Sequence, residues 1–117
     1  MKPYLVAAAL LALTGCAGMK MGHARDAGAI ASLDSARPAA DLAQCVEVTW
    51  ASQSLFGAEA DAFTERSGKG LYTVSDHASD YFADITASGA GSQVKFYGNP
   101  RSGDQARKRQ ATLATCL

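Results

Sequence analysis

Residues 81–98 read YFADITASGAGSQVKFYG and contain two runs in which apolar and polar side chains alternate. A period of two is typical of β-strands that bury one face. The runs Tyr81–Ala87 and Ser92–Gly98 are separated by Ser-Gly-Ala-Gly, whose glycines can adopt the positive φ angles of a tight turn. The stretch therefore predicts an antiparallel β-hairpin.

The side chains of the two runs also predict how the strands pair. If the numbers of opposite residues sum to 179, Ile85 faces Val94 and Asp84 faces Lys95. Apolar side chains then meet apolar ones and opposite charges meet, which stabilises an antiparallel pair. A slip by one residue would place Ile85 opposite Lys95, so the sequence favours this register over its neighbours.

Further elements are predicted outward from the hairpin. Leu71–Ser75 predicts a third strand. From Pro38 to Ser54 apolar residues recur with helical spacing, which predicts an amphipathic helix that begins at the proline. A last helix is expected from about Gln105 to the C-terminus, and a short extra one over Ala58–Arg66 before a turn at Ser67-Gly68-Lys69-Gly70.

These elements predict an α+β domain. A three-stranded antiparallel meander is packed by an N-terminal and a C-terminal helix, in the order α-β-β-β-α. Both helices are expected to cover one face of the meander. The side chains predicted to be buried on that face are Tyr72, Val74, Ala83, Ile85, Val94 and Phe96.

Phe82 and Tyr97 pair on the opposite face in the predicted register. Two exposed aromatic side chains there would indicate a protein-interaction patch. The alternative is that residues 57–70 cover them through Phe63. The sequence does not distinguish these two interpretations.

Composition bounds the classes of protein to consider. The chain has 117 residues, and 11 Lys and Arg balance 11 Asp and Glu, so its formal net charge is zero. This balance argues against a general nucleic-acid binder, and a hydrophobic content of 48% argues against a disordered polar chain. The length allows one small domain. The three cysteines are an odd number, which leaves one unpaired.

The N-terminus accounts for the odd cysteine. Lys2 precedes an unbroken apolar run from Tyr4 to Leu13, which is far shorter than the roughly 20 residues of a membrane-spanning helix. The next residues, Leu13-Thr14-Gly15-Cys16, resemble the lipobox of bacterial lipoproteins. The resemblance implies cleavage before Cys16, attachment of diacylglycerol to its thiol and acylation of the new amine.

The resemblance divides the chain into three parts. They are a lipoprotein signal peptide (residues 1–15), the lipidated Cys16 with a flexible tether (16–37) and a small domain (38–117). Cleavage leaves 117 − 15 = 102 residues with a net charge of 10 − 11 = −1. The residue after Cys16 is Ala17 and not Asp, and in the enterobacterial version of the family this implies sorting to the outer membrane. We therefore expect a protein that is lipid-anchored in the outer membrane and whose domain faces the periplasm.

With Cys16 lipidated, Cys45 and Cys116 remain as an even pair. Outside the cytoplasm two cysteines most simply form a disulfide, and the alternative is two buried, reduced thiols. The disulfide would link the first and last helices and close a loop of about 70 residues, worth about 4 kcal/mol in the chain-entropy model. Two cysteines with only His23 and His77 make a poor zinc set, so we expect no metal site.

Two polar segments contain residue types that could form a chemical site. Asp76-His77-Ala78-Ser79-Asp80 holds catalytic residue types, but residues so close on one loop seldom converge as a triad, and polar turn residues are the preferred interpretation. Arg101, Arg107, Lys108 and Arg109 could contact anionic lipid headgroups or a polyanion of the envelope, although such a cluster is more often a solvated helix face. No cofactor fingerprint is present in the sequence, and we expect no cofactor.

The remainder of the chain resembles small uncharacterised proteobacterial envelope lipoproteins in layout, with a terminal helix that ends in Cys116-Leu117. This likeness implies no activity. We expect a lipid-anchored cell-envelope protein with a non-catalytic structural or protein-interaction role, bound to the membrane through its lipid and to an envelope protein partner. The alternative is a periplasmic ligand-binding or enzyme-inhibitor module with a pocket at Tyr72, Tyr81 and Trp50, and an enzyme that uses His77 ranks last.

Overall fold

The computed structural model describes residues 19–53, 61–76 and 78–117. The predicted signal peptide, Cys16 and His77 lie outside these ranges. The described chain is α+β, as the sequence predicts, and its strands form one five-stranded antiparallel sheet. No helix within the described ranges is long and apolar enough to span a membrane.

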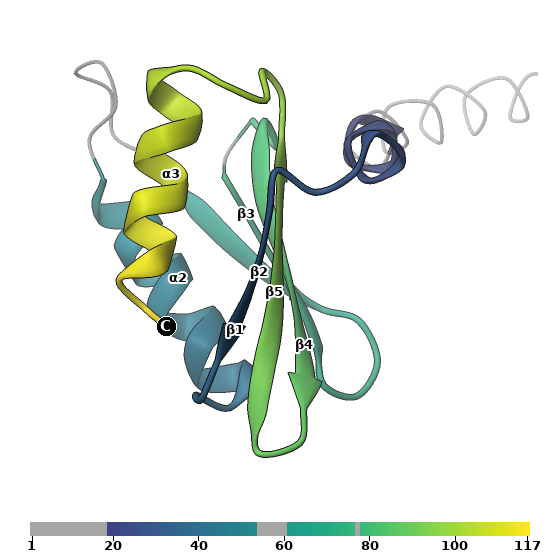
Figure 1. Cartoon of the computed structure of the whole chain (residues 1–117), viewed down its shortest axis with the longest axis vertical. Helices are drawn as coiled ribbons and strands as arrows, with labels where there is room; N and C mark the ends of the chain where they lie inside the picture. Colours follow the sequence, from purple (N-terminus) through teal and green to yellow (C-terminus); the bar gives the residue numbers. More distant parts are fainter. Residues whose placement is uncertain (1–18, 54–60, 77) are drawn as a thin grey trace, which may run out of the picture.

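Residues 19–27 are helical and precede five strands and two further helices. In chain order these elements are β1 (Ala31–Ser35), α2 (Ala39–Ser52), β2 (Ala62–Arg66), β3 (Leu71–Asp76), β4 (Tyr81–Ser88), β5 (Gly91–Gly98) and α3 (Asp104–Ala114). The strand order is β1-β5-β4-β3-β2. Figure 1 shows α2 and α3 on one side of the sheet and helical residues 19–27, in purple, on the other.

The pairing of β4 with β5 confirms the predicted hairpin and its register. The numbers of opposite residues sum to 179 along the whole pair, so Ile85 lies opposite Val94 and Asp84 opposite Lys95. The turn is Gly89-Ala90, and Gly89 has a φ of +60°, a left-handed conformation that glycine adopts without steric cost. The predicted third strand is β3, which pairs antiparallel with β4.

Strand β2 corrects the predicted helix over residues 58–66, of which the structure describes 61–66. The strand pairs with β3 at five positions, with Thr64 opposite Val74 and Phe63 opposite Ser75. Residues such as Glu65 and Arg66 favour a helix in an isolated chain, but backbone pairing with β3 satisfies the hydrogen-bonding groups of the strand. Tertiary pairing outweighs local propensity in this segment.

Strand β1 corrects the predicted flexible tether of residues 16–37. It adds to the far side of β5, and Ala31 lies opposite Phe96 while Leu33 lies opposite Val94. Both side chains pack against the core, whereas Ser32 and Asp34, which alternate with them along the strand, are exposed. Five residues are too few to reveal a periodicity in the sequence, so the strand was missed. The folded domain therefore begins before Pro38, and the sheet has five strands instead of three.

The core lies between the sheet and helices α2 and α3. Trp50 on α2 meets Phe96 edge-on with ring centroids 6.1 Å apart, and Tyr81 stacks on Phe96 at 5.9 Å. Of the six sheet residues predicted to be buried, Tyr72 is only partly buried and the other five have no exposed surface. Side chains of both helices complete the core, including Leu42, Ala43, Val46, Ala106 and Leu113.

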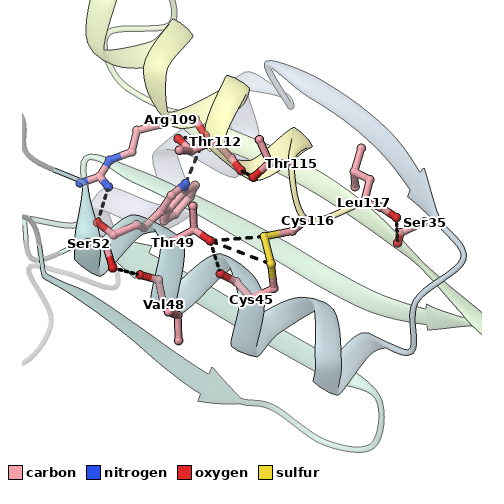
Figure 2. Close-up of a disulfide and its surroundings, with 11 residues drawn as sticks. Ser35, Cys45, Val48, Thr49, Ser52, Arg109, Thr112, Thr115, Cys116 and Leu117 are labelled. Atoms are coloured by element: carbon pink, nitrogen blue, oxygen red, sulfur yellow. Dashed lines mark hydrogen bonds between the residues drawn. A yellow bond between two sulfur atoms is a disulfide. The ribbon is translucent and has the colours of Figure 1, made fainter.

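A disulfide joins Cys45 on α2 to Cys116 just after α3, as predicted, with Cα atoms 5.8 Å apart (Figure 2). Thr49, one turn after Cys45, lies with its Oγ1 3.6 Å from the sulfur of Cys116. The next residue is also held, because Ser35 Oγ donates a hydrogen bond to the carbonyl of Leu117 at 3.2 Å. The end of the chain is thus attached to both α2 and β1.

We expect the double replacement Cys45→Ala and Cys116→Ala to lower the free energy of unfolding by about 4 kcal/mol, because the unfolded chain loses a crosslink that closes a loop of about 70 residues. Urea denaturation of the variant and the oxidised wild type measures the loss. Reduced wild type is the matched control and should unfold with the variant, while reductant should leave the variant unchanged. Equal stability of oxidised and reduced wild type would contradict the prediction.

Candidate functional site

Helical residues 19–27 are attached to the outer face of the sheet by one arginine. Arg25 Nε donates to Asp84 Oδ2 at 2.8 Å, and Arg25 Nη2 donates to Asp84 Oδ1 at 2.9 Å. The guanidinium carbon also lies 4.8 Å from the ring centroid of Phe82. Asp84 is oriented in turn by Thr73, whose hydroxyl donates to it at 2.7 Å. The hydrogen bond to Asp84 raises the pKa of Arg25 further above its ordinary value.

Phe82 and Tyr97 do not form an exposed patch in this structure. Their rings stack at 5.1 Å, as the register predicts, but Phe82 has no exposed surface and Tyr97 only 8%. In the predicted alternative residues 57–70 cover them through Phe63, and the structure places Phe63 on β2 with 52% of its surface exposed. The guanidinium of Arg25 lies over Phe82 instead. Sequence alone could not predict this contact, because Arg25 lies in a segment expected to be a flexible tether and Phe82 is 57 positions further along the chain.

Two further cations hold the same helical segment. The ammonium of Lys20 donates to the carbonyl of Ala78 at 2.9 Å and pairs with Asp80. At the other end, Arg101 donates to the carbonyl of Gly28 at 2.6 Å and to that of Ala29 at 3.3 Å. A cation suits this position, because the carbonyl groups at a helix C-terminus lack helical partners and carry a partial negative charge.

A cleft of about 320 Å³ lies between the helical segment and the residues that follow β5. Two of the four residues that line it from the helix are alanines, and polar side chains line it from both sides. The cleft is lined by Lys20, His23, Ala24, Ala27, Gly98, Asn99 and Arg101. Position 98 requires glycine, because a Cβ atom there would lie 2.1 Å from the buried ring of Tyr81.

The basic cluster expected near the last helix is divided in the structure. Arg101 binds the carbonyl groups after residue 27, and Arg107 forms an exposed pair with Asp104. Arg109 points the other way and is only 2% exposed. The sequence could not separate these roles, because they depend on which side of α3 meets α2.

Arg109 forms a buried network with the end of α2 and with β3. Its Nη1 donates to the carbonyl of Trp50 and to Gln53 Oε1, both at 3.2 Å, and Trp50 Nε1 donates back to the carbonyl of Arg109 at 3.1 Å. Its guanidinium carbon is 5.3 Å from the Trp50 ring centroid. The nearest carboxylate is that of Asp76, with 3.8 Å between Arg109 Nη2 and Asp76 Oδ2.

Burial governs the ionisation of this pair. It lowers the pKa of Arg109 and raises the pKa of Asp76, in each case as the largest effect. The attraction between the two charges opposes both shifts, and Asp76 also accepts a hydrogen bond from the backbone of Asp80 at 2.9 Å. A charge pair of this kind costs desolvation energy and contributes little net stability unless its geometry is excellent.

The residues singled out as catalytic candidates have structural partners. Asp76 contacts Arg109, and Asp80 pairs with Lys20, while His77 between them lies outside the described residues. Trp50 and Tyr81 are completely buried, so these two side chains do not line the pocket that would favour the ligand-binding alternative. Over the described ranges, no group of three or more His, Cys, Asp or Glu residues is placed to hold a metal ion.

No protein-family model matches the chain, and neither the comparison with curated proteins nor that with solved structures finds a match. The candidate site is therefore defined by its own contacts: helical residues 19–27, the outer face of the sheet beneath them and the cleft beside them.

We expect Asp76→Asn to change how stability depends on pH. The raised pKa means that folded Asp76 binds its proton more tightly than unfolded Asp76, whose ordinary pKa is 3.8. The wild type therefore gains stability from this proton at low pH and loses it as the pH rises through the folded pKa. The unfolding free energy of the wild type minus that of the variant should fall as the pH rises from the unfolded pKa of 3.8 to the higher folded pKa. Above the folded pKa this difference should stay level. Urea denaturation of both proteins at stepwise pH measures it, and a difference that grows with pH would contradict the expected sign.

We expect Arg25→Met to loosen helical residues 19–27 by about 1 kcal/mol, because it removes a two-point ion pair and a cation–π contact that are both partly exposed. Amide hydrogen exchange in this helix should accelerate roughly fivefold. Arg107→Met is the matched control, since both partners of its ion pair are at least 70% exposed and it should have no effect on exchange. Equal effects of the two variants would show that Arg25 is not a specific attachment.

Proposed function

We propose that the protein is a lipid-anchored component of the cell envelope with a non-catalytic structural or protein-interaction role. The lipobox-like Leu13-Thr14-Gly15-Cys16 carries this proposal. A diacylglyceryl group with an additional acyl chain anchors a protein stably, whereas one chain binds only marginally. The contacts of Lys20 and Arg25 support the proposal, because they attach the chain that follows Cys16 to the folded domain.

That connection is short. Lys20 follows Cys16 by four residues, so the two Cα atoms lie within about 14 Å of each other even in a fully extended chain. Lys20 and Arg25 both bind the outer face of the sheet or its adjacent loop. A lipid on Cys16 would therefore hold the folded domain against the membrane surface, whereas a long flexible tether would let it move away.

The role of the domain follows from this position. A small domain kept beside the outer membrane is suited to contact other envelope proteins, and the exposed apolar side chain of Val48 lies on α2, on the other side of the sheet from the attached helical segment. The alternative, a periplasmic ligand-binding or enzyme-inhibitor module, stays a proposal with no observation at Trp50 or Tyr81 in its favour.

We expect Cys16→Ser to abolish labelling by an alkyne fatty acid in growing cells and to move the protein from the membrane fraction to the soluble fraction. Fractionation with click detection of the lipid measures both effects. Thr14→Ser is the matched control, because it keeps a small residue in the lipobox-like motif and should remain labelled and membrane-bound. Persistence of Cys16→Ser in the membrane fraction would contradict lipid anchoring.

A further inference from the structure

The cleft beside residues 19–27 stands close to the proposed anchor. Lys20 lines the cleft and is the residue whose distance from Cys16 is limited to about 14 Å. Helical residues 19–27 begin three residues after Cys16, so the anchor and the cleft belong to the same end of the domain. A lipid bilayer that receives the acyl chains of Cys16 must therefore lie near this cleft.

The charges around the cleft are mainly positive. Lys20 and Arg101 stand on opposite sides, and His23 lines the same cavity. The carboxylate beside Lys20 is Asp80, and Asp26 on the same helix is exposed but does not line the cleft. Asp84 is occupied by Arg25 and Thr73 on the sheet. An anion in the cleft would thus meet two cationic side chains and one carboxylate.

These two side chains retain capacity for another acceptor. The ammonium of Lys20 has three N–H groups, and its contacts are with the carbonyl of Ala78 and the carboxylate of Asp80. The guanidinium of Arg101 has five N–H groups, and Nη1 and Nη2 donate to three backbone carbonyls. Ala24 and Ala27 also line the cleft, and their short side chains leave its volume of about 320 Å³ open beside the two cations.

We propose that this cleft is the face of the domain that meets the membrane, and that it binds the phosphate group of an anionic phospholipid. The inference rests on the proposed anchor at Cys16, which brings this face to the bilayer. The headgroup phosphate accepts hydrogen bonds from Lys20 and Arg101, and Ala27 lies beside it. The opposite end of the sheet, with the Gly89-Ala90 turn and Lys69, then points away from the membrane.

The test uses residues 16–117 with Cys16→Ser, which contain every strand and helix described above and carry no lipid. The ¹⁵N-labelled protein is titrated with phosphatidylcholine bicelles that contain no phosphatidylglycerol or about 30% of it, at low ionic strength. We expect chemical-shift changes only with phosphatidylglycerol. They should be confined to the amides of residues 20–27 and of Gly98, Asn99 and Arg101, and Lys69 at the far end of the sheet should not respond.

Charge variants at an exposed position sharpen the test. Ala27→Glu should weaken binding about fivefold and Ala27→Lys should strengthen it by a similar factor, the effect of one charge at an anionic surface. The same two substitutions at Ala40, an exposed position in the first turn of α2, are matched controls and should change binding much less. The NMR spectra themselves report whether the helix of each variant is intact.

Three results would overturn the inference: no response to phosphatidylglycerol, a response spread evenly over the surface, or equal effects of substitutions at Ala27 and Ala40. The same shifts with millimolar inorganic phosphate alone would overturn the membrane assignment in favour of a free-phosphate site. Because this protein carries no lipid, its result is independent of the fractionation of Cys16→Ser, so a failed anchor and a failed membrane face can be told apart.

Discussion

The register between β4 and β5 determines what each face of the sheet presents. Because side chains alternate along a strand, the pairing of Ile85 with Val94 places one apolar set under α2 and α3 and places Phe82, Asp84 and Tyr97 on the other side. The first set builds the core. The second set provides the aromatic surface and the carboxylate that Arg25 contacts, so the attachment of residues 19–27 depends on the same register.

Helix α3 is held mainly by directed contacts. The buried residues of this eleven-residue helix are Ala106, Arg109 and Leu113, of which only Ala106 and Leu113 are apolar. Arg109 binds the middle of α3 to the C-terminal end of α2. The Cys45–Cys116 disulfide joins the residue just after α3 to α2. A hydrogen-bonded cation and a covalent crosslink thus supplement hydrophobic burial where the sequence supplies few large apolar side chains.

The sequence was sufficient for the features that depend on local pattern. Alternation predicted β3, β4 and β5, helical spacing predicted α2, and the arithmetic of the cysteines predicted the disulfide. It was insufficient for the edge strands β1 and β2, because each has five residues and is defined by its partner strand more than by its own side chains. The candidate site was missed for a related reason. Arg25 and Asp84 are 59 positions apart, and only the fold brings them together.

Strand β1 also has a consequence for work with fragments. A chain that begins at Pro38 lacks β1 and exposes the outer edge of β5, whose residues 92–96 otherwise pair along that edge with Ala31–Ser35. Unpaired N–H and C=O groups along a long edge are a template for pairing with another molecule. Such a fragment would keep the disulfide and both packing helices, yet it would tend to associate through β5. Self-association of such a fragment would then result from the missing strand, and it would not be evidence of a natural oligomer.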